Sequence, residues 1–499
     1  MGHPTPVLPS SPIYPVSVSA VRTRRTHRFS STTRGCIQMY TLVTERAMEE
    51  EATPNLPLDI IYQIPKYISD PASLARADSS CKIWRGVIRD SAFLDGLTMR
   101  HLDHGFTSSL LIGFFYQDSA ESPEHLWQHH KDKTRCLAPS FIPMPELLPS
   151  TNHKEGYNSA RPLSLGTFIH GIGSSLNFYE PVVSQDSFLV LCRHSKDPEG
   201  NSMADVVRVC NPLTGEVFQL PDLPYIPPNH YVLLVANDNS LDGCMTQSFQ
   251  LVAIWISGKR IKYVYYCSKT KSWWVPSSFP EVMAGLYLVS TPVAASHGSS
   301  IHWLCGCWKS WSLSHVVSLH VNAEELSYLE LPSEVKRNKA PLLGNSADGA
   351  LLLLIMKGLH MSMWKHKTEP GNGNGDWVRF ETIDMTSFLP MRVLKMHSGA
   401  KIRLEIFRGK SGAVVLWIQG EGIFLFTLSD RSMRKIDNEH LTKKYRFCPY
   451  EIDWLSCLAV TNLVIDGSLP LDVEREKARR RWRILVAKNC TQKAKSTKA

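Results

Sequence analysis

"SFLVLCRH" at residues 187–194, followed by "VVRVCNPLTGE" at 206–216, sets the pattern that most of this chain repeats. The first run is almost wholly apolar and has the length of a strand. The second run ends in a polar turn that closes at Gly215. Short apolar runs bounded by turn residues are typical of buried strands. This stretch therefore predicts a buried strand, a second strand paired with it, a tight turn and a third strand.

The same plan recurs four more times along the chain. The other first strands are "SFQLVAIWI" (248–256), "SSIHWLCG" (299–306), "GALLLLIMK" (349–357) and "GAVVLWIQG" (412–420). The second strands with their turns are "YVYYCSKTKS" (263–272), "VVSLHVNAEE" (316–325), "MSMWKHKTEPGNGNGD" (361–376) and "IFLFTLSDRS" (423–432). Successive turns are 56, 53, 52 and 55 residues apart when measured at Gly215, Lys271, Glu324, Asp376 and Arg431.

A repeat of about 50 residues that holds several short strands is typical of a β-propeller blade. "SLLIGFFYQ" (109–117) and "SFIPMP" (140–145) predict a sixth, irregular blade, and 451–466 a last strand or helix that closes the ring. The fold class is therefore mainly β with a small α-helical N-terminal module, built as a propeller of about six blades. A large β-sandwich is the alternative, since no kelch glycines or Trp-Asp pairs mark the repeats.

The composition divides the chain into four parts. Residues 1–54 are rich in Pro, Ser, Thr and Arg and predict a disordered or targeting-like extension; residues 55–100 predict a helical module. The β domain covers 106–466, and a basic tail covers 467–499. Of the formal net charge of +9, residues 1–50 contribute +3 and 474–499 contribute +8, which leaves the body near neutral. A basic nucleic-acid groove on the body is therefore not expected.

No stretch of the sequence predicts a catalytic, cofactor-binding or metal-binding site. "RGKSGA" (408–413) lacks the first glycine of a phosphate-binding loop, and strand follows "GNGNGD" (371–376) where a helix would be needed. Cys305 and Cys307 lie near His297 and His302 in the sequence, but no zinc-type spacing supports a metal site there. No apolar run approaches the roughly 20 residues that span a bilayer. Neither a membrane nor a cofactor is expected.

Tryptophans near predicted turns are the candidates for a binding surface. Trp274, Trp308 and Trp311 lie at the edges of turns, where an indole supplies apolar area with a polar N–H. We expect these three to contact a target protein, although most aromatic residues on strands belong to a core.

The helical module has two segments with apolar faces. Ile60, Ile61 and Ile64 form a stripe that Pro65 should end or kink, and Asp70-Pro71 gives the next helix an N-cap and a first-turn proline. In that second helix Leu74, Cys81 and Trp84 share a face. Forty residues rarely form a stable core alone, so the module should pack on the β domain or on a partner protein.

"LPLDIIYQIPKYISDPASLARADSSCKIWRGVIRDSAFL" (56–94) resembles an F-box, especially those of plant F-box proteins. "LLIGFFY" (110–116) and "VCNPLTGEVFQLPDLP" (209–224) resemble the F-box-associated propeller-like region more loosely. The sequence departs from the pattern at Pro65, where an aliphatic residue is usual, and at Ser80, where Val is common.

The resemblance implies a substrate receptor of a Skp-cullin-F-box type ubiquitin ligase. The F-box would bind a Skp-family adaptor, and through it a cullin, while the β domain binds an unknown target protein in the cytoplasm or nucleus. The adaptor contacts that it implies are Leu56, Pro57, Ile60, Ile61, Ile64, Leu74, Cys81 and Trp84. The alternative is a propeller enzyme or carbohydrate-binding protein imported into an organelle through residues 1–47, which are Arg-rich and hold their first acid at Glu45.

Overall fold

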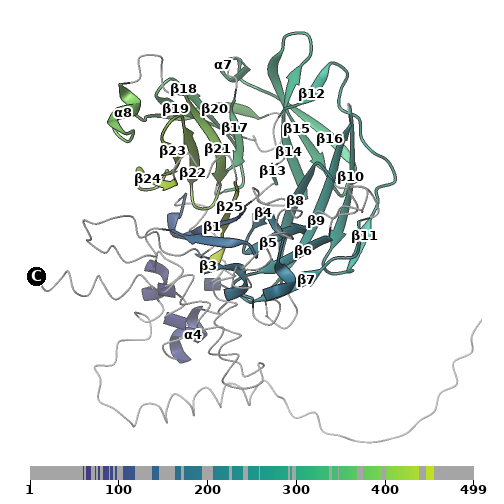
Figure 1. Cartoon of the computed structure of the whole chain (residues 1–499), viewed down its shortest axis with the longest axis vertical. Coiled ribbons are helices and arrows are strands. Elements are labelled where there is room, and N and C mark those ends of the chain that lie inside the picture. Colours follow the sequence, from purple (N-terminus) through teal and green to yellow (C-terminus); the bar gives the residue numbers. More distant parts are fainter. Residues whose placement is uncertain are drawn as a thin grey trace, which may run out of the picture. The chain divides into compact units, whose positions relative to one another are not determined.

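The computed structural model has six antiparallel β-sheets that form a six-bladed β-propeller (Figure 1). It describes parts of 60–97 and, with gaps, 105–454; the longest gaps are 119–137, 145–162 and 194–205. The propeller was predicted from the repeat, and it excludes the β-sandwich. No helix among the described residues is long and apolar enough to cross a membrane.

Each repeat of the sequence makes one blade, whose strands follow one another from the centre outward. Blade 2 holds β4 (Glu180–Gln185), β5 (Phe188–Arg193), β6 (Val206–Asn211) and β7 (Glu216–Gln219). Blade 3 holds β8 (His230–Asn239), β9 (Met245–Ser257), β10 (Arg260–Cys267) and β11 (Ser272–Trp274). Blade 4 holds β12 (Leu286–Leu288), β13 (Val293–Ala294), β14 (Ser300–Cys307), β15 (Ser312–His320) and β16 (Glu325–Glu330).

Two further repeats complete the regular blades. Blade 5 holds β17 (Leu342–Asn345), β18 (Leu351–Lys357), β19 (His360–Lys367) and β20 (Asp376–Asp384). Blade 6 holds β21 (Ile402–Arg408), β22 (Ala413–Ile418), β23 (Gly422–Thr427) and β24 (Ser432–Asp437). Short helices lie in the connections: α7 (Ser333–Lys336), α8 (Met391–Leu394), and the 3-10 turns η2 (Ser108–Leu110), η3 (Leu165–Thr167) and η4 (Gly173–Leu176).

Blade 1 joins the two ends of the β domain. Its order is β25-β1-β2-β3, so the strand nearest the C-terminus, β25 (Tyr445–Glu451), pairs with β1 (Leu111–Asp118), followed by β2 (Ser140–Pro143) and β3 (Leu163–Ser164). β25 also contacts β4 of blade 2. The sixth blade is thus formed by the segments that predicted it. The closing strand ends at Glu451 and therefore lies upstream of 451–466.

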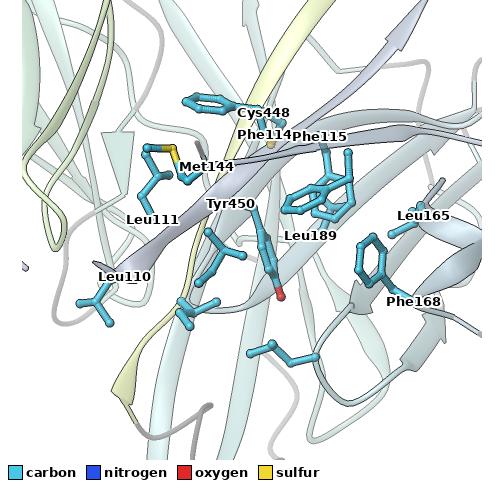
Figure 2. Packing of buried hydrophobic residues seen from close by; sticks show 14 of the residues in the cluster. Leu110, Leu111, Phe114, Phe115, Met144, Leu165, Phe168, Leu189, Cys448 and Tyr450 are labelled. Atoms are coloured by element: carbon cyan, nitrogen blue, oxygen red, sulfur yellow. The ribbon is translucent and has the colours of Figure 1, made fainter. Parts of the chain in front are cut away.

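Aromatic packing holds the closing blade together (Figure 2). Tyr450 of β25 is fully buried, and its ring meets the edge of Phe115 from β1 at 5.2 Å between centroids. Its hydroxyl donates a hydrogen bond of 2.8 Å to the carbonyl oxygen of Ser187, which lies between β4 and β5. Tyr450 therefore joins blade 1 to blade 2 through both apolar and polar contacts.

The repeated turn has a repeated geometry. Gly215, Lys271, Glu324 and Arg431 all have positive φ, between 52° and 81°. At Gly215 and Lys271 the backbone N–H bonds to the carbonyl oxygen four residues earlier, at 2.7 and 2.8 Å. Different residue types thus occupy the same left-handed position in each turn. The turns are therefore regularly spaced although the residues in them differ.

Two tryptophans on outer strands join neighbouring blades. Trp273 of β11 donates its indole N–H to the carbonyl oxygen of Pro221, just after β7, at 2.9 Å. Trp377 of β20 does the same to the carbonyl oxygen of Glu330 at the end of β16, also at 2.9 Å. In both cases an indole on the outermost strand of one blade is hydrogen-bonded to the end of the outermost strand of the preceding blade. These two indoles therefore have a structural role.

Only parts of the predicted helical module lie among the described residues, and they do not show the module as a whole. A 3-10 helix, η1, spans Ile64–Tyr67 and includes Pro65, and α4 spans Lys82–Ile88. Leu74, Ile88 and Phe93 are buried and belong to the same hydrophobic cluster as the closing blade. This apolar side of the module therefore packs on the β domain.

Candidate functional site

A strained turn presents two tryptophans at one end of blade 4. Trp308 and Trp311 lie in the turn between β14 and β15, and Trp311 has φ 52°. The N–H of Trp311 bonds to the carbonyl oxygen of Cys307 at 2.9 Å, and the N–H of Trp308 to that of Gly285 at the same distance. A left-handed conformation costs a non-glycine residue about 1–2 kcal/mol. Gly215 and Lys271 have the same left-handed conformation and the same hydrogen bond, so the fold sets the backbone at Trp311. What distinguishes this turn is a bulky, largely exposed indole at that position.

Tyr287 holds these indoles in one cluster. Its ring lies 4.5 Å from that of Trp308, and the two indoles meet nearly perpendicular at 5.3 Å. Tyr287 stands opposite Gly306 in the sheet, where a Cβ on the glycine would come within 2.4 Å of the tyrosine ring. Gly306 is therefore needed for the ring to lie flat on the strand.

We call Tyr287, Trp308 and Trp311 the aromatic surface. Trp311 is 73% exposed and Trp308 49%. The sequence predicted Trp308 and Trp311 as target-binding residues and missed Tyr287. Gly306 inside an apolar strand is the signal that points to a covering ring.

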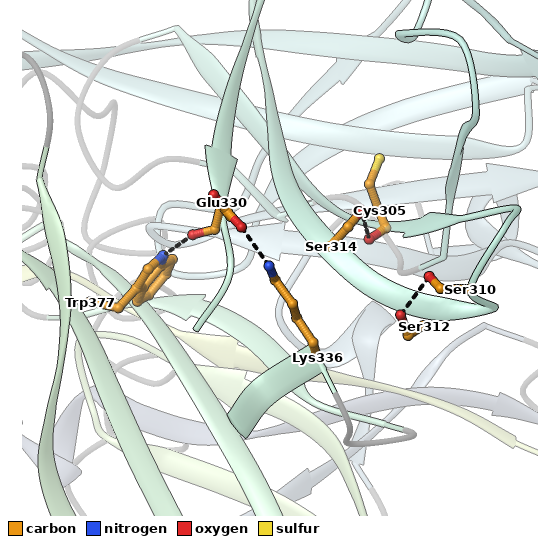
Figure 3. A network of polar contacts seen from close by, with 7 residues as sticks. All are labelled: Cys305, Ser310, Ser312, Ser314, Glu330, Lys336 and Trp377. Carbon is orange, nitrogen blue, oxygen red and sulfur yellow. Dashed lines mark hydrogen bonds and ion pairs between the residues drawn. The ribbon is translucent and has the colours of Figure 1, made fainter. Parts of the chain in front are cut away.

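A polar framework lies next to this turn (Figure 3). Ser310 and Ser312 share a hydrogen bond of 2.7 Å across the turn, and Ser314 donates to the carbonyl oxygen of Cys305. At the end of β16 the Glu330 carboxylate pairs with Lys336 at 2.5 Å. The backbone that carries the indoles is held by the N–H bonds of Trp308 and Trp311 and by the bond from Ser314. An ordered backbone loses less conformational entropy on binding.

Trp274 lies elsewhere. Its ring stacks on Tyr265 with an interplanar angle of 8° and stays half-exposed. Ser277, three residues on, is bonded to Glu324, which lies beyond the opposite end of β15 from Trp311. Since a nine-residue strand is roughly 30 Å long, Trp274 does not join the aromatic surface.

The predicted adaptor residues fall into three groups. Leu56, Pro57, Ile61 and Cys81 lie outside the described residues. Ile64 and Trp84 are half-buried, and Leu74 is fully buried in the cluster with the closing blade. Ile60 is exposed, as are two apolar neighbours that the prediction did not include, Tyr67 and Ile83.

A buried ionic cluster joins blades 1, 2 and 6. Lys410 pairs with Asp186, and the Glu451 carboxylate accepts the backbone N–H of Ser411 at 2.6 Å. Arg408 donates to the carbonyl oxygens of Ser184 and Pro449, at 3.1 and 3.0 Å. These carboxylates are buried, so the arrangement ties three inner strands together and offers no group to a substrate.

The ionic cluster predicts a specific alkaline instability. Burial alone would lower the pKa of Lys410, but the carboxylates of Asp186, Asp453 and Glu451 outweigh burial and raise it. A cation whose folded-state pKa is raised stabilises the fold fully below its unfolded pKa of about 10.4, and that contribution is lost as pH rises further. We expect the stability difference between wild type and Lys410→Met to shrink above pH ~10.4 by up to about 1.4 kcal/mol per pH unit. Chemical denaturation of both proteins from pH 9 to 11.5 measures this difference in unfolding free energy. A difference that stays constant over that range would contradict a raised pKa for Lys410.

The described residues contain no group of three or more His, Cys, Asp or Glu side chains that could hold a metal ion. His302 lies close to Cys305 in sequence, but its Nδ1 is 2.7 Å from the hydroxyl of Ser318. Burial and neighbouring His320 lower the pKa of His302 to about 4. His302 is therefore neutral and already hydrogen-bonded.

Comparisons with known proteins give a family and distant structural likenesses. The model of a domain of unknown function, DUF7595, matches residues 156–462. No curated protein sequence matches the chain. TolB from Acinetobacter baumannii is 10% identical with a TM-score of 0.31, covering 74% of this chain and 73% of its own. An α-L-arabinofuranosidase from Fusarium graminearum is 10% identical with a TM-score of 0.28, covering 52% and 80%. Likenesses this low carry no functional argument.

Proposed function

Because this chain belongs to the DUF7595 family, whose description assigns no function, we propose its function from its own residues. It is a non-catalytic protein-interaction receptor that captures a target protein on the aromatic surface of blade 4. The observation that carries this proposal is Trp311, a largely exposed indole held at positive φ in a well-bonded turn. The propeller fold is compatible with such a receptor.

The finer proposal is a substrate receptor of a Skp-cullin-F-box ubiquitin ligase acting in the cytoplasm or nucleus. It rests on the F-box-like residues 56–94. It is supported by the described part of the helical module, which buries Leu74 and Ile88 yet leaves Ile60 and Ile83 exposed. Exposed apolar side chains on this segment are what an adaptor contact would need, and they would mark a contact surface if they formed one continuous patch.

Adaptor binding tests the finer proposal, and the chain offers a matched control. "LPLD" occurs at 56–59 in the F-box-like segment and again at 469–472 near the tail. We expect Leu56→Ala/Pro57→Ala to weaken binding of a purified plant-type Skp adaptor at least about tenfold, since truncated anchor residues cost more than ~1 kcal/mol. Leu469→Ala/Pro470→Ala should leave it unchanged. The proposed ubiquitin-ligase role would be wrong if the wild-type chain did not bind the adaptor, or if both variants lost adaptor affinity equally.

Sugar binding is the second candidate, and the exposed face of Trp311 favours it because an open indole can stack on a sugar ring. A glycan array probed with the wild-type chain separates the two functions. Binding to glycans that depends on Trp311, without adaptor binding, would support the sugar-binding alternative.

A further inference from the structure

Charges around the aromatic surface are unevenly paired. The carboxylates in the connections beside it all have cationic partners: Glu281 pairs with Arg260 at 2.6 Å, Glu330 with Lys336 at 2.5 Å, and Glu334 with Arg379 at 3.3 Å. Among the described residues, no ion pair involves Lys259 or Lys309. Two positive charges without an ion-pair partner in the described part of the chain therefore lie here, Lys309 in the β14–β15 turn of blade 4 and Lys259 in the β9–β10 turn of blade 3.

Lys309 lies beside the indoles, and a short stretch of chain links Lys259 to them. Lys309 lies inside the turn, between Trp308 and Trp311, and is exposed. The carbonyl oxygen of Lys259 accepts the N–H of Val282 at 2.7 Å, and three residues later Gly285 accepts the N–H of Trp308. The path from Lys259 to Trp308 along these bonds and residues is therefore at most roughly 20 Å, given about 3.3–3.6 Å per extended residue.

The apolar part of the surface is small and open. The rings of Trp308 and Trp311 are 5.3 Å apart between centroids. The carbonyl oxygen of Gly285 accepts the N–H of Trp308, and a Cβ on Gly285 would meet nothing within 4 Å, so the backbone there is open to a ligand. Two extended residues of a ligand, at ~3.3 Å each, would cover the distance between the indoles.

We propose that the aromatic surface binds a short, extended acidic segment of the target protein, with at least one large apolar side chain between Asp or Glu residues. This inference rests on the proposed function and names its target class. The apolar side chain packs on Trp308 and Trp311, and the carboxylates pair with Lys309 and Lys259. Opposite charge on the segment speeds encounter and rejects basic sequences.

A phage-displayed library of random twelve-residue peptides, selected on the immobilised full-length chain, tests the proposal. Selection against the Trp308→Ala/Trp311→Ala variant removes peptides that bind elsewhere. We expect the remaining peptides to be enriched in Asp and Glu beside Phe, Leu, Ile or Trp. Their affinity should fall as salt rises from 50 to 300 mM, since salt screens exposed charges.

Charge reversal then identifies the lysines. We expect Lys309→Glu to weaken an enriched synthetic peptide about tenfold and Lys259→Glu by a smaller factor. Lys401→Glu in blade 6 makes the same charge change at an exposed site away from the surface and should alter the affinity less than twofold. Enriched peptides that lack acids, or a Lys309→Glu variant that binds normally, would overturn the proposal.

The experiments distinguish a failure of the acidic-segment inference from a failure of the proposed receptor function. If no peptide is enriched while the Trp variant still loses a target protein, the surface recognises a folded partner, and the acidic-segment inference alone fails. If the Trp variant retains every target, the proposed function fails with it.

Discussion

The Tyr450→Ala variant is expected to lose about 4 kcal/mol of unfolding free energy. Tyr450 is fully buried between Phe115 and Phe141, at 5.2 and 6.5 Å between ring centroids, and its hydroxyl is bonded to Ser187. Replacing a buried aromatic residue by alanine leaves a cavity and costs about 3–5 kcal/mol. The loss should be large because this side chain lies in the strand that closes the ring.

Two companion variants separate the causes of that loss. Tyr450→Phe keeps the ring and removes one hydrogen bond, so we expect a loss of about 1 kcal/mol. Tyr67→Ala removes a tyrosine that is 83% exposed and should cost less than ~0.5 kcal/mol. Urea denaturation followed by circular dichroism measures all three. A Tyr450→Ala loss below 1 kcal/mol would mean that β25 does not close the propeller.

Removing the two exposed indoles should lower the affinity for the target more than removing any other side chain of blade 4. We expect Trp308→Ala/Trp311→Ala to lower affinity for the target roughly 100-fold or more, because tryptophan hot spots contribute about 2–4 kcal/mol. Stability should fall only modestly, by about 1 kcal/mol, since Trp311 is mostly exposed and Trp308, which packs on Tyr287, is about half-exposed. Trp311→Gly should also relieve the strain at φ 52°, so this variant can bind less while folding at least as well.

Trp274→Ala is the matched control, because it removes an indole as exposed as that of Trp308 from the far end of the neighbouring blade. Quantitative recovery of the same target by the three chains measures the difference. Equal recovery by wild type and the blade 4 variant would place the target elsewhere on the molecule.

The repeat predicted the propeller because strand spacing is set by local residues. Buried runs such as 187–194 and 248–256 pair within their own blade, so one repeat contains nearly all the information for one sheet. The closing strand was harder to locate. It pairs with β1, more than 300 residues earlier, and no local pattern distinguishes 445–451 from 451–466 as its partner.

The candidate site was predictable only in its most exposed part. Trp308 and Trp311 flank a turn, and the sequence therefore indicated both. Tyr287 reaches them only because β12 pairs with β14, which brings it opposite Gly306. Trp274 looked equivalent in sequence, yet the three-dimensional arrangement separates it from the others. Which aromatic side chains come together depends on how distant segments pair in the sheets. The residue types at the turns do not reveal that pairing.

Affinity purification of the tagged chain from plant cells, read by quantitative mass spectrometry, tests the account most directly. We expect the wild-type chain to recover a Skp-family adaptor, a cullin and a target protein. Leu56→Ala/Pro57→Ala should lose the adaptor and cullin and keep the target, whereas Trp308→Ala/Trp311→Ala should lose the target and keep the adaptor. A wild-type chain that recovers neither adaptor nor cullin, or two variants that recover the same proteins, would contradict a receptor with two separate binding surfaces.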